Sequence, residues 1–232
     1  ISEEPYDPIA NQFLPDRYVE GTCPHCNYES ARGDQCDDCG KTLDSNELIN
    51  PRSKLNPDAK IEFRETEHLF FKLSEFRDVL LEWLSEGKGH WRPSVINFTR
   101  NWLKEGLIDR AVTRDLDWGI EIPREGYENK RMYVWFEAVM GYYSASVHWA
   151  KNQGNPDEWK KWWENEDSEH YYFMAKDNIP FHTIIWPAML SGCGYKLPYD
   201  VPANEYLLLD SSQFSKSRRH AIWIPDYLDR YD

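Results

Sequence analysis

The sequence predicts an α/β protein that combines a parallel sheet with a small metal-binding module. Two strand-like runs, 131–136 and 171–174, each lead into an apolar helical segment, 137–149 after the first and 180–190 after the second. Because a repeated strand-to-helix unit needs crossover connections, this pattern favours parallel strands. The third observation is a set of four cysteines spaced C-x2-C-x9-C-x2-C, which is typical of a zinc site.

The composition limits the functional classes. With 232 residues, of which 41% are hydrophobic and 15% aromatic, the chain can build one large domain or two modest ones. A net charge of −13 argues against broad binding to DNA or to an anionic membrane, so a phosphate ligand would need a local basic cluster such as 216–220. The sequence has no stretch of 18 apolar residues and no signal peptide, which predicts a cytoplasmic protein without a membrane span.

The first elements are an extended approach over 1–20, which carries three prolines, and then the four cysteines. Each C-x2-C pair turns two thiolates toward one point, and two pairs give the tetrahedral sulfur set that Zn²⁺ prefers, with no open position for catalysis. We therefore predict one structural zinc ion. Two disulfides are the alternative, which the unpaired Cys193 and the missing secretory signal disfavour. Cys193 itself is expected to be buried. The predicted ligands are Cys23, Cys26, Cys36 and Cys39.

The middle of the chain predicts helices that pack into a core. An irregular connection over 46–64 precedes a short strand over 67–72. Apolar residues at helical spacing then indicate a helix over 73–85, with Ser74 as its cap, and a second helix over 94–105. These stripes favour core packing over ligand binding. Their members are Phe76, Val79, Leu80, Trp83 and Leu84, then Val95, Phe98, Trp102 and Leu103.

The second half of the chain alternates strands with loops. A charged break over 113–121 marks a domain boundary before the strand over 131–136. The polar linker over 152–167 contains tryptophans, which favour packing, and a short helix over 157–164. A further strand over 204–209 leads into a small-residue, basic loop.

The stretch 170–190 is the centre of the predicted functional site. Its strand ends in a loop of the turn formers Lys176, Asp177 and Asn178, and Pro180 then opens a helix. Such a junction offers free backbone N–H groups and the positive end of a helix dipole to an anionic ligand. A nucleotide-type site and a purely structural junction both remain open at this point.

Six segments, in order along the chain, resemble class I methionyl-tRNA synthetases: FLPDRYVEGTCP, RETEHLFFKLSEF, NWLKEGLIDRAVTRDLDWGIEIP, YVWFEAVMGYYSAS, KDNIPFHTIIWPAML and FSKSR. The resemblance implies that 1–112 is a zinc-bearing α+β connective insert, that 113–206 is the second half of a Rossmann-type catalytic domain, and that 207–232 begins a stem-contact region. The first half, with the His-Ile-Gly-His signature, is not in this sequence. We therefore expect this chain alone to be inactive.

The resemblance implies an enzyme that activates methionine with ATP, accompanied by Mg²⁺, to methionyl-adenylate and then transfers the methionine to tRNA(Met). The implied partners are methionine, ATP and tRNA(Met). The alternative is a non-catalytic module, either a zinc-containing RNA-binding or scaffold protein or a degenerate synthetase-like paralogue. The net charge of −13 argues against the RNA-binding version.

Site residues are carried over from the family only where a motif matches. The positions that line its methionine pocket are Trp135, Ala138, Tyr142, Asn178 and His182. Aromatic walls with one hydrogen-bonding side chain suit a thioether, which is polarizable and a weak acceptor. The catalytic positions are Arg114 near the charged end of the substrate, Asp177 at the ribose and Lys216 at the phosphates. The ATP set is Asp177 and Lys216 with Ser215 and Ser217, the serines beside this lysine in the family's second signature.

The residues alone also allow structural interpretations and show departures from the family pattern. His182 fits a core histidine as well as a ligand-binding one, and Arg114 fits an ion pair at a domain boundary. The family's first signature lysine and two glycines are replaced here by Gln213, Ala175 and Arg219. Two-zinc relatives have a second pair of knuckles at positions that are held here by Asp7, Ala10 and Ser53, so we expect a single metal ion.

Overall fold

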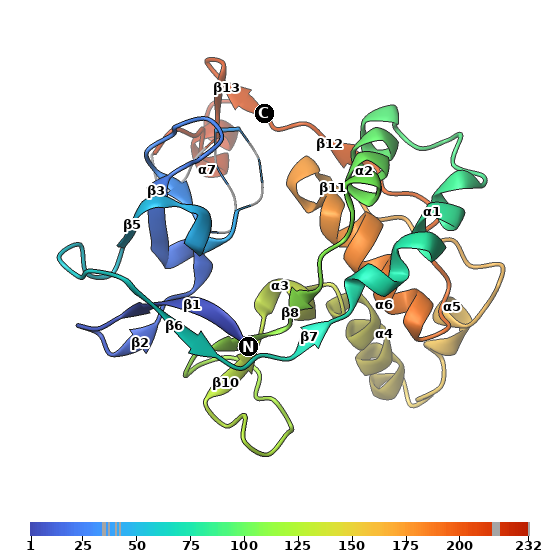
Figure 1. The fold of residues 1–232 in the computed structure, drawn as a ribbon. Coiled ribbons are helices and arrows are strands. Elements are labelled where there is room, and N and C mark those ends of the chain that lie inside the picture. Colours follow the sequence, from blue (N-terminus) through green and yellow to red (C-terminus); the bar gives the residue numbers. More distant parts are fainter. Residues whose placement is uncertain (34–35, 37, 40, 42, 215–218, 232) are drawn as a thin grey trace. The chain divides into compact units, whose positions relative to one another are not determined.

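A computed structural model describes residues 1–232 apart from 34, 35, 37, 40, 42, 215–218 and 232 (Figure 1). The described residues form two compact units. Unit 1 consists of Ile1–Lys72 with Asp109–Ala138, and unit 2 consists of Leu73–Ile108 with Val139–Asp232. The boundaries predicted after 112 and 206 concern the domains of a larger protein and stay predictions.

Unit 1 is assembled from short antiparallel strands (Figure 1). β1 (Ser2–Asp7) pairs with β2 (Gln12–Phe13) and β6 (Glu62–Thr66), and β3 (Val19–Thr22) pairs with β4 (Ala31–Arg32) and β5 (Ile49–Ser53). Further pairs join β7 (Phe70–Phe71) to β8 (Arg110–Ala111) and β9 (Thr113–Asp115) to β10 (Lys130–Met132). The short helices are α3 (Val134–Ala138) and the 3-10 turns η1 (Asp16–Tyr18) and η2 (Ser45–Glu47).

Two sequence predictions for unit 1 are wrong. The segments 1–20 and 46–64 are neither an extended approach nor an irregular connection, because both contribute strands. Their prolines are tolerated where the missing N–H is not needed. Pro51 lies in β5, which is an edge strand of its sheet, and Pro5 in β1 uses its carbonyl group, which accepts a hydrogen bond from the N–H of Leu14 at 2.8 Å.

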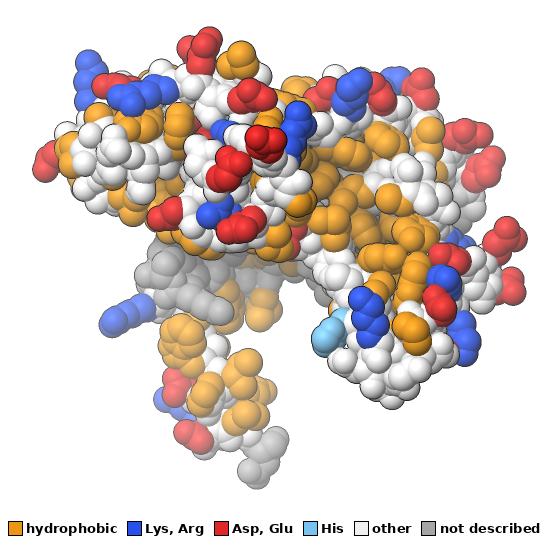
Figure 2. All heavy atoms as spheres, turned by 90° about the horizontal axis from the view of Figure 1, so that it is seen from below, with side chains coloured by type: hydrophobic (Ala, Val, Ile, Leu, Met, Phe, Trp, Pro, Cys, Tyr) orange, Lys and Arg blue, Asp and Glu red, His pale blue; other side chains and the backbone are white. Residues whose placement is uncertain are grey.

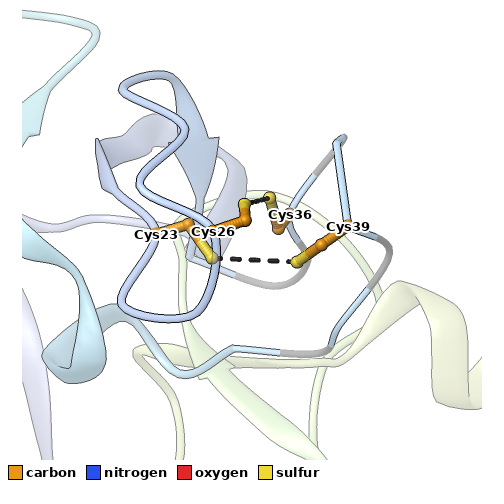
Figure 3. A group of neighbouring side chains, drawn as sticks. All are labelled: Cys23, Cys26, Cys36 and Cys39. Atoms are coloured by element: carbon orange, nitrogen blue, oxygen red, sulfur yellow. Dashed lines mark hydrogen bonds between the residues drawn. The ribbon is translucent and has the colours of Figure 1, made fainter.

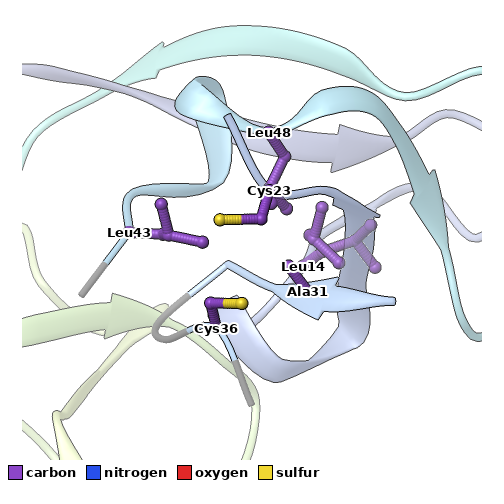
Figure 4. Close-up of a cluster of buried hydrophobic side chains, with 7 residues drawn as sticks. Leu14, Cys23, Ala31, Cys36, Leu43 and Leu48 are labelled. Atoms are coloured by element: carbon purple, nitrogen blue, oxygen red, sulfur yellow. The ribbon is translucent and has the colours of Figure 1, made fainter. Parts of the chain in front are cut away.

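The core of unit 1 surrounds the cysteines (Figure 4). Its buried side chains are Leu14, Val19, Cys23, Ala31, Cys36, Leu43 and Leu48. Gly33 allows η1 and η2 to approach this core closely, because a Cβ atom there would overlap Ser45 Oγ and the carbonyl oxygen of Asp16. The two buried cysteines are therefore held in an aliphatic environment by a backbone that only glycine fits at position 33.

Unit 2 is mainly helical. Its α-helices are α1 (Arg77–Ser85), α2 (Pro93–Glu105), α4 (Gly141–Asn152), α5 (Lys160–Trp163), α6 (Trp186–Gly192) and α7 (Ile224–Leu228). Single turns precede two of them: the 3-10 turns η3 (Leu73–Phe76) and η4 (Lys176–Asn178) and the π-helical turn η5 (Phe181–Ile185). The strands are β11 (Met174–Ala175), β12 (Ala203–Asn204), β13 (Leu208–Leu209) and β14 (Ser212–Gln213).

The predicted helix over 94–105 is confirmed as α2, which ends at Gly106 with a left-handed φ of 101°. The predicted helix over 73–85 is α1 with a preceding 3-10 turn, so Ser74 is not its cap. Of the predicted apolar stripes, Val79 and Phe98 are exposed. The buried face of α2 instead includes Thr99, whose hydroxyl donates to Val95 and lies 2.9 Å from Thr183 Oγ1.

The direction of strand pairing corrects part of the predicted sheet. β10, which overlaps the start of the predicted strand 131–136, pairs antiparallel with β9, so it does not begin a parallel unit. In the described part of the chain, parallel pairing joins β11 to β12, with an additional bridge between Tyr171 and Asp200. Strand propensity does not specify the partner, which explains the error. The strands predicted over 67–72 and 204–209 are shorter than expected, because only β7 lies in the first and β12 and β13 divide the second.

Aromatic side chains form the core of unit 2. The buried members are Val139, Trp163, Tyr172, Trp186 and Leu190. The linker tryptophans differ in burial, because Trp163 is buried in the core and Trp162 is 53% exposed. Cys193 is exposed, not buried as predicted, because it follows the last residue of α6 and precedes the left-handed Gly194 in a surface turn.

The surface carries mixed charge. Acidic and basic side chains are interspersed on the face drawn in Figure 2, with hydrophobic side chains visible between them. The chain as a whole carries a net charge of −13. None of the helices described is long and apolar enough to cross a membrane.

Candidate functional site

The four predicted metal ligands lie together in unit 1 (Figure 3). The Sγ atoms of Cys23 and Cys39 are 3.8 Å apart, those of Cys26 and Cys36 are 3.6 Å apart, and all four lie within 4.8 Å of one another. These separations are too long for disulfide bonds. A tetrahedral site with Zn–S bonds of about 2.3 Å places its sulfur atoms about 3.8 Å apart. The cluster therefore fits one tetrahedral metal ion.

The turns around the cysteines prepare one thiol for ionisation. The backbone N–H of His25 donates to Cys23 Sγ at 3.4 Å. Burial raises the pKa of Cys23, but hydrogen bonds from the N–H groups of His25 and Cys26 and from the side chains of Cys26 and Cys36 lower it to about 7 overall. Because a metal binds the thiolate and not the thiol, these N–H groups favour metal binding.

Asp7 and Ser53 each form a turn in unit 1 that contains no sulfur. The buried carboxylate of Asp7 accepts hydrogen bonds through Oδ1 from the N–H groups of Ile9 at 2.9 Å and Ala10 at 3.0 Å. Oδ2 accepts from Ser53 Oγ at 3.0 Å and from Asn56 Nδ2 at 2.8 Å. Ser53 Oγ in turn accepts from N–H groups two and three residues later, as Asp7 does. Hydrogen bonds thus join the two turns at Asp7, Ala10 and Ser53, the positions from which a single metal ion was predicted.

Tyr142, Asn178 and His182 come together in unit 2. His182 is 5% exposed, and its Nδ1 lies 2.9 Å from the carbonyl oxygen of Asn178, while Nε2 lies 2.9 Å from the Tyr142 hydroxyl. A carbonyl oxygen only accepts, so Nδ1 carries the proton and Tyr142 donates to Nε2 when the ring is neutral. Burial lowers the pKa of His182 and favours that neutral ring. Asn178 takes part through its backbone, and Tyr142 is 45% exposed.

Arg114, on β9 in unit 1, is held by several partners. Its guanidinium lies 3.3 Å from Asp16 and donates to the carbonyl oxygens of Ala111 at 3.0 Å and Thr113 at 2.9 Å. The guanidinium carbon is 4.0 Å from the centre of the Tyr133 ring. Burial lowers the pKa of Arg114, yet Asp16 and its other partners raise it overall, so the side chain stays charged. The ion pair considered from the sequence is present.

The other predicted residues are less closely associated. Trp135 and Ala138 lie on α3 in unit 1, where the guanidinium of Arg17 is 5.6 Å from the Trp135 ring. Asp177 is an exposed residue of η4 in unit 2. Ser215, Lys216 and Ser217 lie outside the described residues, so the geometry of the predicted ATP set is not described.

All three departures from the family pattern fall in described backbone, and Gln213 is the last residue of β14. Arg219, which replaces a family glycine, has a φ of 53° and so occupies the left-handed region that glycine favours. Ala175, which replaces another, lies in β11 and is half-buried.

Sequence reasoning missed a buried polar cluster in unit 1. Asp115 and Lys130 form an ion pair at 2.7 Å with side chains only 8% and 7% exposed. Two threonines and His68 complete the cluster. No local pattern signals this burial, because Thr113, Arg114 and Asp115 are all polar and the partners of Asp115 lie 15 and 49 positions away.

Comparison with known proteins identifies a single family over the entire chain. The family model described as tRNA synthetases class I (M) matches residues 1–232. A methionine–tRNA ligase of Dehalococcoides mccartyi is 62% identical over 98% of this chain and 41% of its own length. The corresponding ligase of Thermomicrobium roseum is 57% identical over 95% of this chain and 38% of its own length.

A solved structure supports the fold. The Mycobacterium tuberculosis methionyl-tRNA synthetase bound by methionyl-adenylate matches 99% of this chain and 38% of its own chain, with a TM-score of 0.60 and 20% sequence identity. At that identity the likeness shows a shared fold. This chain spans about two fifths of the length of the curated relatives, 41% for the ligase of Dehalococcoides mccartyi.

Proposed function

This chain belongs to the class I tRNA synthetase family of the methionine type, and on that premise we propose that it is part of a methionine–tRNA ligase. Such an enzyme activates methionine with ATP to methionyl-adenylate and transfers the methionine to tRNA(Met). The observation that carries the proposal is the family match over all 232 residues, together with 62% identity to a named ligase. The comparisons do not favour the non-catalytic alternative.

We assign the methionine side chain to the pair Tyr142 and His182. The hydrogen bond between them is supported on the other side of the imidazole by the carbonyl group of Asn178, which fixes the ring orientation. An exposed phenol beside aromatic rings suits a polarizable thioether and disfavours a charged side chain. The family resemblance adds Trp135 and Ala138 to this assignment.

The charged groups of the substrates and the adenosine ribose are assigned to five residues. Arg114 would face an anionic group, Asp177 would bind the adenosine ribose, and Lys216, with Ser215 and Ser217, would bind the phosphates of ATP with Mg²⁺. A unit charge pair at about 4 Å is worth about 4 kcal/mol at an effective dielectric of about 20. We therefore expect Lys216→Ala to slow adenylate formation roughly 30- to 1000-fold with methionine affinity nearly unchanged.

The remaining assignments complete the proposal. The cysteine cluster holds one Zn²⁺, whose filled sulfur shell has a structural role. The segment 1–112 is the connective insert, 113–206 is the second half of the Rossmann-type domain, and 207–232 begins the stem-contact region. The cytoplasmic location expected from the sequence is also part of this proposal.

Methionine-dependent exchange of pyrophosphate into ATP by the full-length protein tests the function. Tyr142→Phe and His182→Ala should raise the Michaelis constant for methionine roughly 5- to 150-fold, because a polar or shape gap costs about 1 to 3 kcal/mol. The constant for ATP should change much less. Tyr143→Phe is the matched control, since this neighbouring hydroxyl bonds to Tyr195 in the aromatic core.

The possible outcomes separate the claims. A full-length protein without methionine-dependent exchange would refute the proposed activity. If Tyr142→Phe raises the Michaelis constants for methionine and for ATP equally, Tyr142 and His182 have a structural role and do not bind methionine. The isolated 232 residues should show only background exchange, because they span about 41% of the length of a relative that is named as a ligase.

A further inference from the structure

Strand β9 of unit 1 separates two sets of side chains. Successive residues of a strand point to opposite faces, so Thr113 and Asp115 share one face and Arg114 occupies the other. Thr113 is fully buried, and its face meets the polar cluster of unit 1. The opposite face carries Arg114 with Asp16 and Tyr133.

Asp115 is the centre of the buried cluster. Oδ1 accepts a hydrogen bond from Lys130 Nζ at 2.7 Å, and Oδ2 accepts one from Thr66 Oγ1 at 2.8 Å. Lys130 Nζ also donates to Thr66 Oγ1 at 2.8 Å, which closes a ring of three groups. His68 Nε2 lies 3.4 Å from Asp115 Oδ2, and His68 Nδ1 lies 2.9 Å from Thr113 Oγ1.

This cluster ties three segments together. Thr66 ends β6, Asp115 ends β9 and Lys130 begins β10. A buried ion pair of this kind is costly to break, because removing one partner leaves an uncompensated charge in a low-dielectric environment. The charged groups are nearly inaccessible to water, so the cluster holds the strands in place and is not itself a ligand site.

The same strands hold Arg114. Tyr133 follows β10 directly, its N–H donates to the carbonyl group of Val112 at 2.9 Å, and its ring lies 4.0 Å from the Arg114 guanidinium. Asp16 is at 3.3 Å, which is long for a charge-assisted hydrogen bond. Among the described residues, Arg114 Nε is buried and has no hydrogen-bond partner. The Arg114 side chain is 19% exposed, so a small local movement would let its guanidinium donate to an anion.

We propose that Asp115 and Lys130 are positioning residues, which fix the ribbon of β9 and β10 so that Arg114 is aimed at an anionic group of the bound substrate, a carboxylate or a phosphate. The inference rests on the proposed function, which assigns Arg114 to the charged end of the substrate. The bound anionic group would replace the long contact between Arg114 and Asp16. It would accept hydrogen bonds from the Arg114 guanidinium, whose position the ion pair of Asp115 and Lys130 fixes.

A double-mutant cycle in the full-length protein tests the coupling. The single changes are Asp115→Asn and Arg114→Lys, and the measured quantity is the pre-steady-state rate of adenylate formation at saturating methionine and ATP. Asp115→Asn should lower this rate up to roughly 100-fold, because misplacement of a catalytic group by about 1 Å costs that much. In the Arg114→Lys background the same change should cost much less, since residues that act through one another are not additive.

A matched control separates positioning from general stability. Asp7→Asn alters another buried carboxylate of unit 1 that accepts several hydrogen bonds but is not bonded to β9 or β10. It should leave the rate within about twofold of the wild type. If Asp115→Asn does not fold, as judged by near-ultraviolet circular dichroism, the paired change Asp115→Asn with Lys130→Gln removes both charges and should fold while keeping the loss of rate.

Several results would overturn the inference. They are an unchanged rate in Asp115→Asn, equal losses in the wild-type and Arg114→Lys backgrounds, or a paired variant that also fails to fold, which would make the cluster a general scaffold. A wild-type protein that forms no adenylate would refute the proposed function instead, so the two failures are distinguishable.

Discussion

Replacement of one sulfur ligand in the full-length protein should remove the metal and unfold the segment around it. Cys26→Ser exchanges one of four Sγ atoms that lie within 4.8 Å of one another for a poorer zinc ligand. Loss of a partner that only supports a ligand lowers metal affinity about 10- to 100-fold. We therefore expect loss of a direct ligand to exceed 100-fold. Zinc binding in small finger peptides is worth on the order of 10 to 16 kcal/mol, so residues 20–45 should lose their fold with the metal.

Metal analysis and amide hydrogen exchange measure the two parts of this prediction. The wild-type protein should contain one Zn²⁺ per chain, and Cys26→Ser should release it at a much lower chelator concentration. Exchange should then increase in β3 and β4, while α2 of unit 2 stays protected. Cys193→Ser is the control, because this exposed cysteine lies outside the cluster and its loss should leave metal content unchanged.

Zero or two equivalents of metal in the wild-type protein would refute the geometry from which the prediction is made. A Cys26→Ser variant that binds Zn²⁺ as tightly as the wild-type protein would also refute it. If the metal is lost and exchange over 20–45 does not change, the aliphatic side chains around Cys23 and Cys36 are sufficient to hold the segment without it.

Three further predictions concern the free energy of unfolding of the full-length protein, measured by urea titration. Burial lowers the pKa of His68 to about 4, whereas a histidine in an unfolded chain has a pKa of about 6.5. The stability that the neutral ring provides is therefore present above about pH 6.5 and is lost as the pH falls toward 4. This loss should reach about 3 kcal/mol, and His68→Asn should show a correspondingly flatter pH dependence; an unchanged slope would contradict it. Asp7→Ala should lower the free energy of unfolding by roughly 3 to 5 kcal/mol at pH 7, because several buried donors lose a charged acceptor. A decrease of less than about 0.5 kcal/mol would show that water replaces the carboxylate. Trp163→Ala should cost roughly 3 to 5 kcal/mol, whereas Trp162→Ala, at a 53% exposed position, should stay within about 0.5 kcal/mol; equal costs would contradict the assignment of Trp163 to the core.

Local sequence patterns predicted those parts of the fold that depend on neighbouring residues. The spacing of Cys23, Cys26, Cys36 and Cys39 predicted their convergence, because each C-x2-C turn is a local structure. Helix α2 was predicted with its end, since apolar periodicity and Gly106 are both encoded in one segment. The family was predicted from six motifs, and the match over residues 1–232 confirms it.

Features that depend on distant partners were not predictable in the same way. Nothing near β10 specifies that its neighbour is β9 in the antiparallel direction. The burial of Asp115 depends on Lys130, which lies 15 positions away, and on Thr66, which lies 49 positions away. His182 shows the same limit, because its contact with Tyr142 spans 40 positions and gives the ring a partner that helical periodicity cannot indicate.

The turns around Asp7 and around the cysteines use one backbone arrangement with different chemistry. In each, an acceptor side chain binds N–H groups two and three residues later, but oxygen atoms complete one pair of turns and sulfur atoms the other. Peroxide or another oxidant can join thiolates into disulfides and so abolish their metal affinity, whereas the carboxylate, hydroxyl and amide groups around Asp7 undergo no such reaction. Under oxidative stress, unit 1 should therefore lose its order first around Cys23 to Cys39. Strands β1 and β5, which Asp7 and Ser53 join, should keep their structure.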